Sequence, residues 1–193
     1  MQSLLKKIRE CRVCAAHLPH EPRPVLRAHT NARLLLVGQA PGRRVHETGI
    51  PWNDPSGDTL REWLQLTREQ FYDERQIAIV PAGFCYPGKG KSGDLPPRPE
   101  CAPLWHPPLL AAMPKIKLTL LIGSYAQAYY LKEHAKPTLT QTVANYNEYL
   151  PSFLPLPHPS PRNRLWLRRN PWFAEDVLPI LREQVSKALS GLV

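Results

Sequence analysis

The sequence contains no long hydrophobic run, and it has only four cysteines and two methionines. Because no stretch of about 18 apolar residues occurs, we expect no membrane-spanning helix. The N-terminal residues MQSLLKKIRECRVC lack the apolar segment and the small-residue cleavage site of a signal peptide, so we expect a cytoplasmic protein. In the reducing cytosol, cysteines bind metals more often than they form disulfides.

Acidic residues are also scarce relative to basic ones. The chain has 16 Asp and Glu against 25 Lys and Arg, which gives a formal net charge of +9 and an isoelectric point near 9.6. A basic surface favours polyanionic partners, above all nucleic acid, although the same charge can serve solubility alone. The length of 193 residues suits one compact domain over residues 1–193, which we expect to be a monomer.

Four apolar segments of strand length recur along the chain, at residues 33–38, 76–83, 116–123 and 151–157. Runs of this kind are typical of a parallel sheet that is covered on both faces. Helical patterns follow them at residues 59–67, 99–113, 124–134 and 170–190. We expect the second of these helices to break near Pro107. We expect the last to begin with Asn170 as N-cap and to be distorted at Pro179.

This alternation predicts a three-layer α/β/α sandwich around a four-stranded parallel sheet. In such folds the ligand site lies beyond the carboxyl ends of the strands. The rule points to the loops that follow Gly38, Pro81, Gly123 and Pro157.

The four cysteines form one close pair, Cys11 and Cys14, and one distant pair, Cys85 and Cys101. A structural zinc site of four cysteines usually has two close pairs, whereas a 4Fe-4S cluster tolerates uneven spacing. Four unrelated buried cysteines are the alternative. Since all four lie in predicted loops and none is spare, we expect one shared metal site.

The first predicted strand runs into the loop GQAPG, in which Gly38 permits a tight turn. This loop presents backbone N–H groups and the Gln39 amide, but it lacks the third spaced glycine of a dinucleotide-binding loop. Downstream, Trp52 lies in a turn-rich segment beside Asn53 and Asp54. Trp52 either packs on the core or serves as a stacking platform for a base. Its two neighbours either shape the turn or contact a ligand.

The segment PLPHPSPRN places prolines at alternate positions from Pro155 to Pro161, with His158 among them. Residues that precede proline are driven into extended geometry, so we expect a stiff rod that fixes His158 before any ligand arrives. Basic side chains follow directly. Such charge runs are usually a solvated helix face.

Three motifs in this order resemble the uracil-DNA glycosylase superfamily: LLLVGQAPG, IGSYAQA and LPLPHPSPRN. The cysteine pattern is most similar to family 4, the iron–sulfur glycosylases. That family has C-x-x-C near the N-terminus and two further cysteines fifteen residues apart. The resemblance extends from Cys11 to the last predicted helix. It implies a DNA glycosylase that flips a deaminated base, uracil or a related one, out of double- or single-stranded DNA and hydrolyses its N-glycosidic bond in base excision repair.

The resemblance also implies roles for individual residues. His158 would contact the base carbonyl, and Gln39, Asp54 and Asn53 are candidates for the remaining catalytic work. Base binding would involve Trp52, Gly38, Ala40 and Pro41. A 4Fe-4S cluster, with zinc as the alternative, would be held by Cys11, Cys14, Cys85 and Cys101. A loop at residues 162–165 would enter the minor groove. The expected DNA-binding residues are Ser160, Arg162, Asn163, Arg164, Leu165, Arg168, Arg169, Lys89 and Lys91.

The sequence departs from family 4 at three positions. Gln39 replaces a glutamate, Pro81 replaces the asparagine that reads the uracil edge, and Gly90 replaces a second asparagine. Either another side chain reads the base, with Asn53, Asp54 and Asp94 as candidates, or the substrate differs.

Three other functions are alternatives to a glycosylase. A non-catalytic binder of damaged or uracil-containing DNA on the same fold is the main alternative. A zinc-stabilised nucleic-acid binder is another. A C-x-x-C redox protein requires the thiol pair at a helix N-terminus after a first strand, whereas CRVC follows a helix and precedes the sheet.

Overall fold

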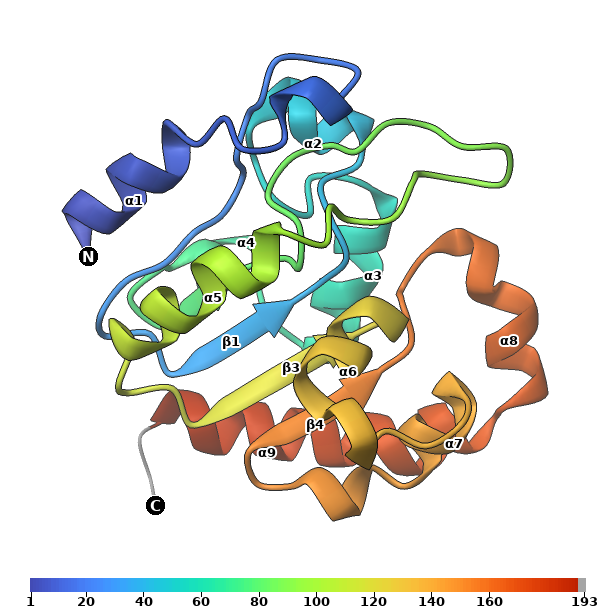
Figure 1. Cartoon of the computed structure of the whole chain (residues 1–193). Helices are drawn as coiled ribbons and strands as arrows, with labels where there is room; N and C mark the ends of the chain where they lie inside the picture. The colour runs from blue at the N-terminus through green and yellow to red at the C-terminus, as the bar shows by residue number, and fades with distance from the viewer. Residues whose placement is uncertain (191–193) are drawn as a thin grey trace.

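A computed structural model describes residues 1–190 and confirms the predicted architecture. Four parallel strands form one sheet in the order β2-β1-β3-β4 (Figure 1). Their bounds are Leu34–Val37 (β1), Ile77–Ile79 (β2), Leu118–Ile122 (β3) and Phe153–Leu156 (β4). Each lies inside the segment predicted from the sequence but is shorter, because the flanking residues form the turns. All four carboxyl ends therefore reach the same edge of the sheet.

Helices cover both faces of this sheet (Figure 1). The bounds of the nine helices are Gln2–Arg9 (α1), Arg43–Thr48 (α2), Pro55–Leu64 (α3), Arg68–Tyr72 (α4), Cys101–Ala111 (α5), Ser124–Leu131 (α6), Leu139–Ala144 (α7), Arg164–Arg169 (α8) and Leu178–Ser190 (α9), all within residues 1–190. None of them combines the length and the apolar character that crossing a bilayer requires.

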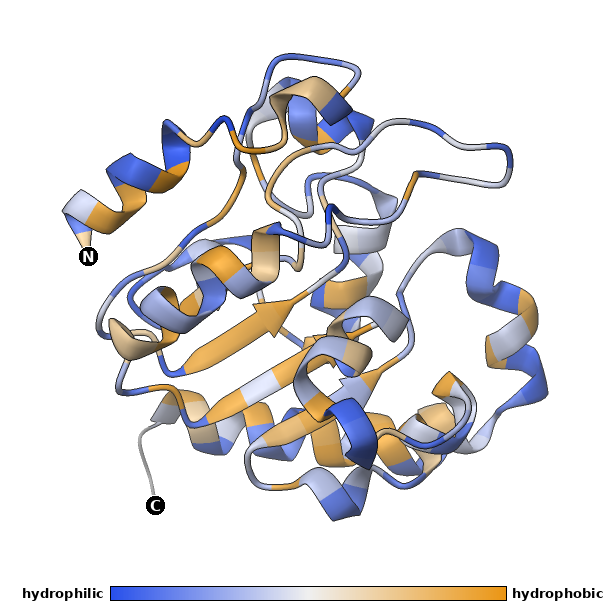
Figure 2. Ribbon diagram, viewed as in Figure 1, coloured by the Kyte–Doolittle hydropathy of each residue, from blue (hydrophilic) through white to orange (hydrophobic). Residues whose placement is uncertain are grey.

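Side chains that alternate along β1 divide the core into two layers. Leu34 and Leu36 pack toward α3 and α9, while Leu35 and Val37 pack toward α1 and α5. All four are fully buried, as the run LLLV predicts for a strand between two helical layers. Figure 2 shows the apolar strands at the centre and hydrophilic residues along the helices.

Two helix predictions were wrong in detail. Helix α5 runs through Pro107 and Pro108 without a break. The two missing N–H groups would have bonded to the carbonyls of Pro103 and Leu104, which lie on an exposed side of the helix where water can satisfy them.

The C-terminal helix begins differently from the prediction. Asn170 does not cap it with its side chain, because its Oδ1 atom accepts from the Trp172 indole. The predicted distortion lies just before Pro179, as a wide π-helical turn at Phe173–Val177. Pro179 has no N–H group, so it cannot donate the hydrogen bond that an α-helix would form at this position. The wider π-helical turn before it accommodates this missing hydrogen bond.

Candidate functional site

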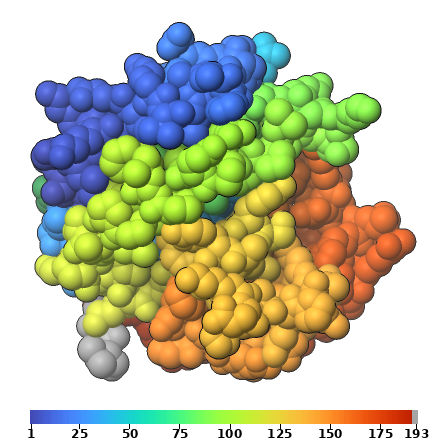
Figure 3. Space-filling model, viewed as in Figure 1, coloured from blue at the N-terminus to red at the C-terminus, as the bar shows by residue number. Residues whose placement is uncertain are grey.

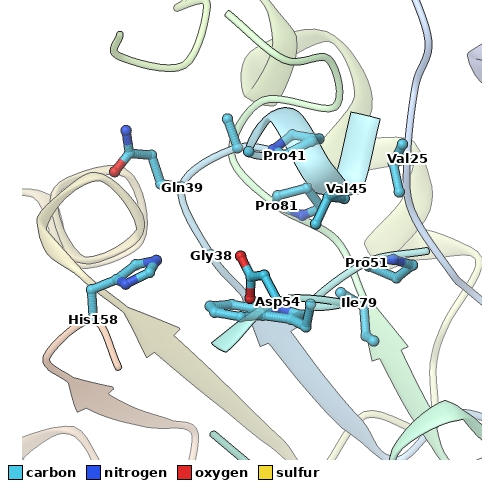
Figure 4. Close-up of a pocket in the computed structure, with 13 residues that line it drawn as sticks. Val25, Gly38, Gln39, Pro41, Val45, Pro51, Asp54, Ile79, Pro81 and His158 are labelled. Carbon is cyan, nitrogen blue, oxygen red and sulfur yellow. The ribbon is translucent and has the colours of Figure 1, made fainter. Parts of the chain in front are cut away.

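A small cavity lies at the carboxyl ends of β1, β2 and β4, where the strand order predicted a ligand site (Figure 4). Its volume is ≈ 50 Å³, and its lining includes Gly38, Trp52, Pro81 and His158. An open groove of ≈ 440 Å³ adjoins it. The lining shared by cavity and groove consists of Gln39, Ala40, Gly42, Asp54 and His158.

The loop after β1 is fixed to the loop after β2. Backbone carbonyls of Gly38 and Gln39 accept hydrogen bonds from Ala82 N and Gly83 N, both at 2.9 Å. The Gln39 amide donates to Leu95 O at 3.3 Å, so its side chain is turned toward the 87–98 loop. Ala40 and Pro41 also line the cavity. The sequence-predicted loop therefore forms one rigid wall of the site.

Trp52 forms part of this cavity rather than serving only the core. Its φ angle is 56°, in the left-handed region, which costs a non-glycine residue about 1–2 kcal/mol. A methyl group at Gly38 would lie 2.9 Å from Trp52 Cζ2, so the indole lies directly against the end of β1. Its ring centroid is 5.5 Å from that of His158, at an interplanar angle of 33°.

His158 reaches the cavity from the segment that follows β4. Ser160 has extended backbone angles, as predicted for a residue before proline, and the first turn of 3-10 helix begins at Pro161. Asn163 Nδ2 donates to His158 O at 2.7 Å and closes this segment on itself. Burial lowers the pKa of His158, and the nearby Asp54 carboxylate opposes that shift in part. The imidazole is consequently neutral at pH 7 and can donate one hydrogen bond.

The two polar neighbours of Trp52 have different positions. The Asp54 carboxylate accepts from Gly57 N at 2.9 Å, caps α3, and lines both the cavity and the groove. Asn53 Oδ1 instead accepts from Arg68 Nη2 at 3.2 Å, and Asn53 does not line the cavity. The structure therefore brings Asp54 together with His158 and Gln39, whereas Asn53 is turned toward α4.

Two segments border the groove on opposite sides, the 87–98 loop and the residues that follow His158. Arg162 Nη1 donates to Ser92 O at 3.2 Å and joins them. Ser160, Arg162 and Asn163 line the groove. Figure 3 shows these green and orange segments beside each other on one side of the molecule.

The remaining predicted DNA-binding residues are exposed at the surface. The predicted loop at residues 162–165 is helical, a 3-10 turn that leads into α8. Leu165 on α8 exposes 48% of its surface. The exposed cations are Arg164, Arg168 and Arg169 on α8, with Lys89 and Lys91 on the 87–98 loop. Asp94, the third candidate base reader, is exposed at the groove and does not line the cavity.

Pro81 lies in the cavity wall with its carbonyl turned away from the ligand side. Its oxygen is 3.0 Å from Nε2 of His106, which is buried, and His106 Nδ1 is 2.8 Å from the Tyr130 hydroxyl. Because a carbonyl can only accept, Nε2 carries the proton. Burial lowers the pKa of His106 to about 4. Sequence reasoning missed this histidine, since a single His in a proline-rich helix gives no recognisable signal.

The four cysteines line a second cavity of ≈ 20 Å³. They come from three separate segments of the chain and none forms a disulfide. Burial raises the pKa of Cys85 to about 11 and that of Cys101 to about 12. Within residues 1–190, no three Cys, His, Asp or Glu side chains are arranged as a ready site for a metal ion. A donor set of four thiols suits a soft metal centre that would draw them together.

Comparisons with known proteins agree with this geometry. A family model described as the uracil DNA glycosylase superfamily matches residues 26–182. A type-4 uracil-DNA glycosylase from Thermotoga maritima is 25% identical over 194 residues, which cover 98% of this chain and 93% of that protein. The family match covers all four strands of the sheet and the loops that follow them.

Proposed function

Since the chain belongs to the uracil-DNA glycosylase superfamily, we propose that it is a DNA glycosylase. It would flip a deaminated base, uracil or a related one, out of DNA and hydrolyse the N-glycosidic bond as a step of base excision repair. The observation that carries this proposal is the convergence of a neutral His158 and the Trp52 ring on one cavity at the strand ends. Both groups have the chemistry that holding and releasing a base requires.

Cleavage of the bond leaves positive charge on the sugar and negative charge on the departing base. His158 would donate its hydrogen bond to the base oxygen on which that charge develops. A fixed donor of this kind is worth about 3–4 kcal/mol in the transition state, by analogy with oxyanion-hole variants. Water adds its oxygen to C1′ and its proton goes to the solvent or to a base on the enzyme. Asp54 and Gln39 border the same space and are the candidates to orient that water.

The cavity size favours a single-ring base. An apolar cavity of about 150 Å³ accommodates benzene, whereas this cavity measures ≈ 50 Å³ and opens into the groove. A pyrimidine would extend partly into the groove, and a purine would extend further into it. We therefore propose uracil in preference to hypoxanthine or xanthine.

The surface around the groove suits a DNA duplex. Flipping a base costs a few kcal/mol, which an inserted side chain and a stacking partner offset. Leu165 is an exposed apolar residue of α8 and would be the inserted side chain, and the cations of α8 and the 87–98 loop would contact phosphates. Arg162 already donates a hydrogen bond to Ser92 O. To bind a phosphate through the same N–H group, Arg162 would have to break this hydrogen bond.

A 4Fe-4S cluster held by Cys11, Cys14, Cys85 and Cys101 is part of the proposal, by analogy with the type-4 relative. Such a cluster would tie the N-terminal segment, the loop after β2 and the start of α5 together, and its role would be structural. Zinc binds sulfur at about 2.3 Å and needs four closely grouped thiolates. A 4Fe-4S cluster also takes four thiolates but tolerates the uneven spacing of this set, so the cluster is favoured over zinc.

A second function is favoured by one observation. Pro81 occupies the position from which the asparagine of family 4 reads uracil, and its carbonyl is bound to His106. A cavity without that reader suits a protein that holds damaged or uracil-containing DNA without cleaving it.

A cleavage assay separates the two functions. We expect purified protein to release uracil from oligonucleotides, with hypoxanthine and xanthine released far more slowly. His158→Ala should remove most activity, about 100-fold or more, and retain DNA binding. His134→Ala is the matched control because its side chain is 78% exposed. No product from any base, together with retained binding, would establish the binder instead. Equal activity of His158→Ala and wild type would disprove the assigned role of His158.

A further inference from the structure

The Pro51–Trp52 peptide is held in an unusual conformation below the base cavity. Trp52 is one of three non-glycine residues with positive φ in residues 1–190, and its ring lies against Gly38. An L-residue adopts this geometry only when its surroundings hold it there. The groups that hold it are therefore relevant to the shape of the cavity.

Arg61 is the first of these groups. Its side chain is buried within α3, and Nη1 donates to Trp52 O at 3.3 Å. Its Nη2 pairs with Asp58 at 2.5 Å, one turn earlier on the same helix. A buried guanidinium is costly to desolvate, so its hydrogen-bond partners fix its position. Arg61 thereby anchors the carbonyl of the left-handed residue itself.

Tyr72, at the end of α4, holds the neighbouring carbonyl. Its hydroxyl donates to Pro51 O at 2.8 Å and lies 3.5 Å from Arg61 Nη1. The two carbonyls of the Pro51–Trp52 unit are thus held by one connected pair of side chains. Gly57 completes this support, because a Cβ there would lie 1.8 Å from Trp52 O. Helix α3 can approach Trp52 so closely only with glycine at that position.

These contacts exceed what the turn before α3 needs. Asp54 already caps that helix by accepting from Gly57 N. Arg61 instead binds the carbonyl of Trp52, whose ring lies 5.5 Å from that of His158, and Tyr72 binds the carbonyl of the preceding Pro51. Arg61 and Tyr72 would therefore affect the cavity by setting the orientation of the Trp52 indole.

We propose that Arg61 and Tyr72 are positioning residues for base recognition. They hold the Pro51–Trp52 backbone so that the Cζ2 edge of the Trp52 indole lies against Gly38 and the ring lies beside that of His158. This inference rests on the proposed glycosylase function. It assigns the support of the base site to two side chains, one from α3 and one from α4.

The test uses Tyr72→Phe, which removes only the hydroxyl, in the full-length protein. The first measurement is the NMR resonance of the His158 ring protons, which the indole 5.5 Å away shifts by its ring current. We expect Tyr72→Phe to move this resonance, and Tyr125→Phe, an exposed tyrosine that is 40% accessible, to leave it in place. This measurement needs neither activity nor DNA.

The second measurement is a double-mutant cycle on uracil release. We expect Tyr72→Phe to lower kcat/KM about fivefold to tenfold in the wild-type background, as for the loss of one or two hydrogen bonds. In the Trp52→Ala background the same change should cost less than about twofold, because its target is gone. The thermal midpoint of each variant records its structural effect separately.

Each outcome decides a different point. An unmoved His158 resonance, or an equal loss of kcat/KM in both backgrounds, would overturn the positioning role. Full activity of Trp52→Ala would show that the base does not depend on the indole, and would overturn it as well. If wild type releases no base at all, the proposed function fails, and the resonance alone then decides whether Tyr72 sets the Trp52 geometry.

Discussion

Gly38→Ala provides a sharp test of the base site, because the structure gives the size of the disturbance. The added methyl group would lie 2.9 Å from Trp52 Cζ2, and ordinary contact begins at 3.4 Å. The indole must therefore move by at least 3.4 − 2.9 = 0.5 Å. The strand end cannot move instead, because Gly38 O is bound to Ala82 N at 2.9 Å.

A displacement of this size matters for catalysis more than for folding. Misplacement by about 1 Å costs an enzyme on the order of 100-fold in rate, so we expect about tenfold lower single-turnover release of uracil. DNA binding, which depends on the cations around the groove, should be unchanged within about twofold.

The assay compares single-turnover rates and fluorescence-detected DNA binding for Gly38→Ala and Gly90→Ala. Gly90 is the matched control because its added methyl group would meet the mobile end of Leu95, an exposed side chain, at 3.2 Å. Equal rates for Gly38→Ala and wild type would refute the view that the indole forms the floor of the base site.

Three further predictions follow from other parts of the molecule. The pKa of His106 falls from 6.5 to about 4 on folding. Between these pH values the unfolded chain binds a proton at His106 that the folded protein does not bind. The folded protein therefore loses stability as the pH falls from about 6.5 to about 4. The expected loss is about 3 kcal/mol in denaturant titrations, and His106→Gln should flatten this pH dependence; a parallel decline in both proteins would contradict the assignment. Purified protein should be brown and contain iron, and Cys85→Ser should lose the iron and lower the thermal midpoint, whereas a colourless protein with one zinc would show a different metal. Arg168→Ala and Arg169→Ala should each reduce the salt dependence of DNA binding by about one unit of slope, with little effect on the cleavage rate of bound DNA; unchanged slopes would place the duplex elsewhere.

Several elements of the fold could be predicted because their signals are local. The run LLLV at residues 34–37 is apolar at every position, as a strand buried on both faces must be. Ser160 is extended, as the geometry of a residue before proline dictates. The unbroken α5 was missed because its tolerance of Pro107 depends on which side of the helix faces water.

The candidate site likewise contains residues that could be predicted from the sequence and residues that could not. Gln39 and His158 were predicted from loops that follow strands and Trp52 from a turn-rich segment, and all three line one cavity. Asn53 and Asp54 are adjacent in sequence and look equivalent there. Only Asp54 lines the cavity, because Arg68 of α4 holds Asn53 away from it. Arg61, Tyr72 and His106 contact backbone carbonyls that lie 9, 21 and 25 residues earlier in the chain, and a single sequence carries no record of such contacts.

The sequence by itself therefore determined the order of strands and helices, the stiff segment around His158 and the set of four cysteines. These follow from periodicity, from the fixed geometry of proline and from side-chain chemistry, which are properties of neighbouring residues. The tertiary structure alone decided that the Trp52 indole forms the floor of the cavity, that the Pro81 carbonyl is bound to His106, and that Arg162 joins the two sides of the groove. Those features depend on distances between segments that only packing brings together.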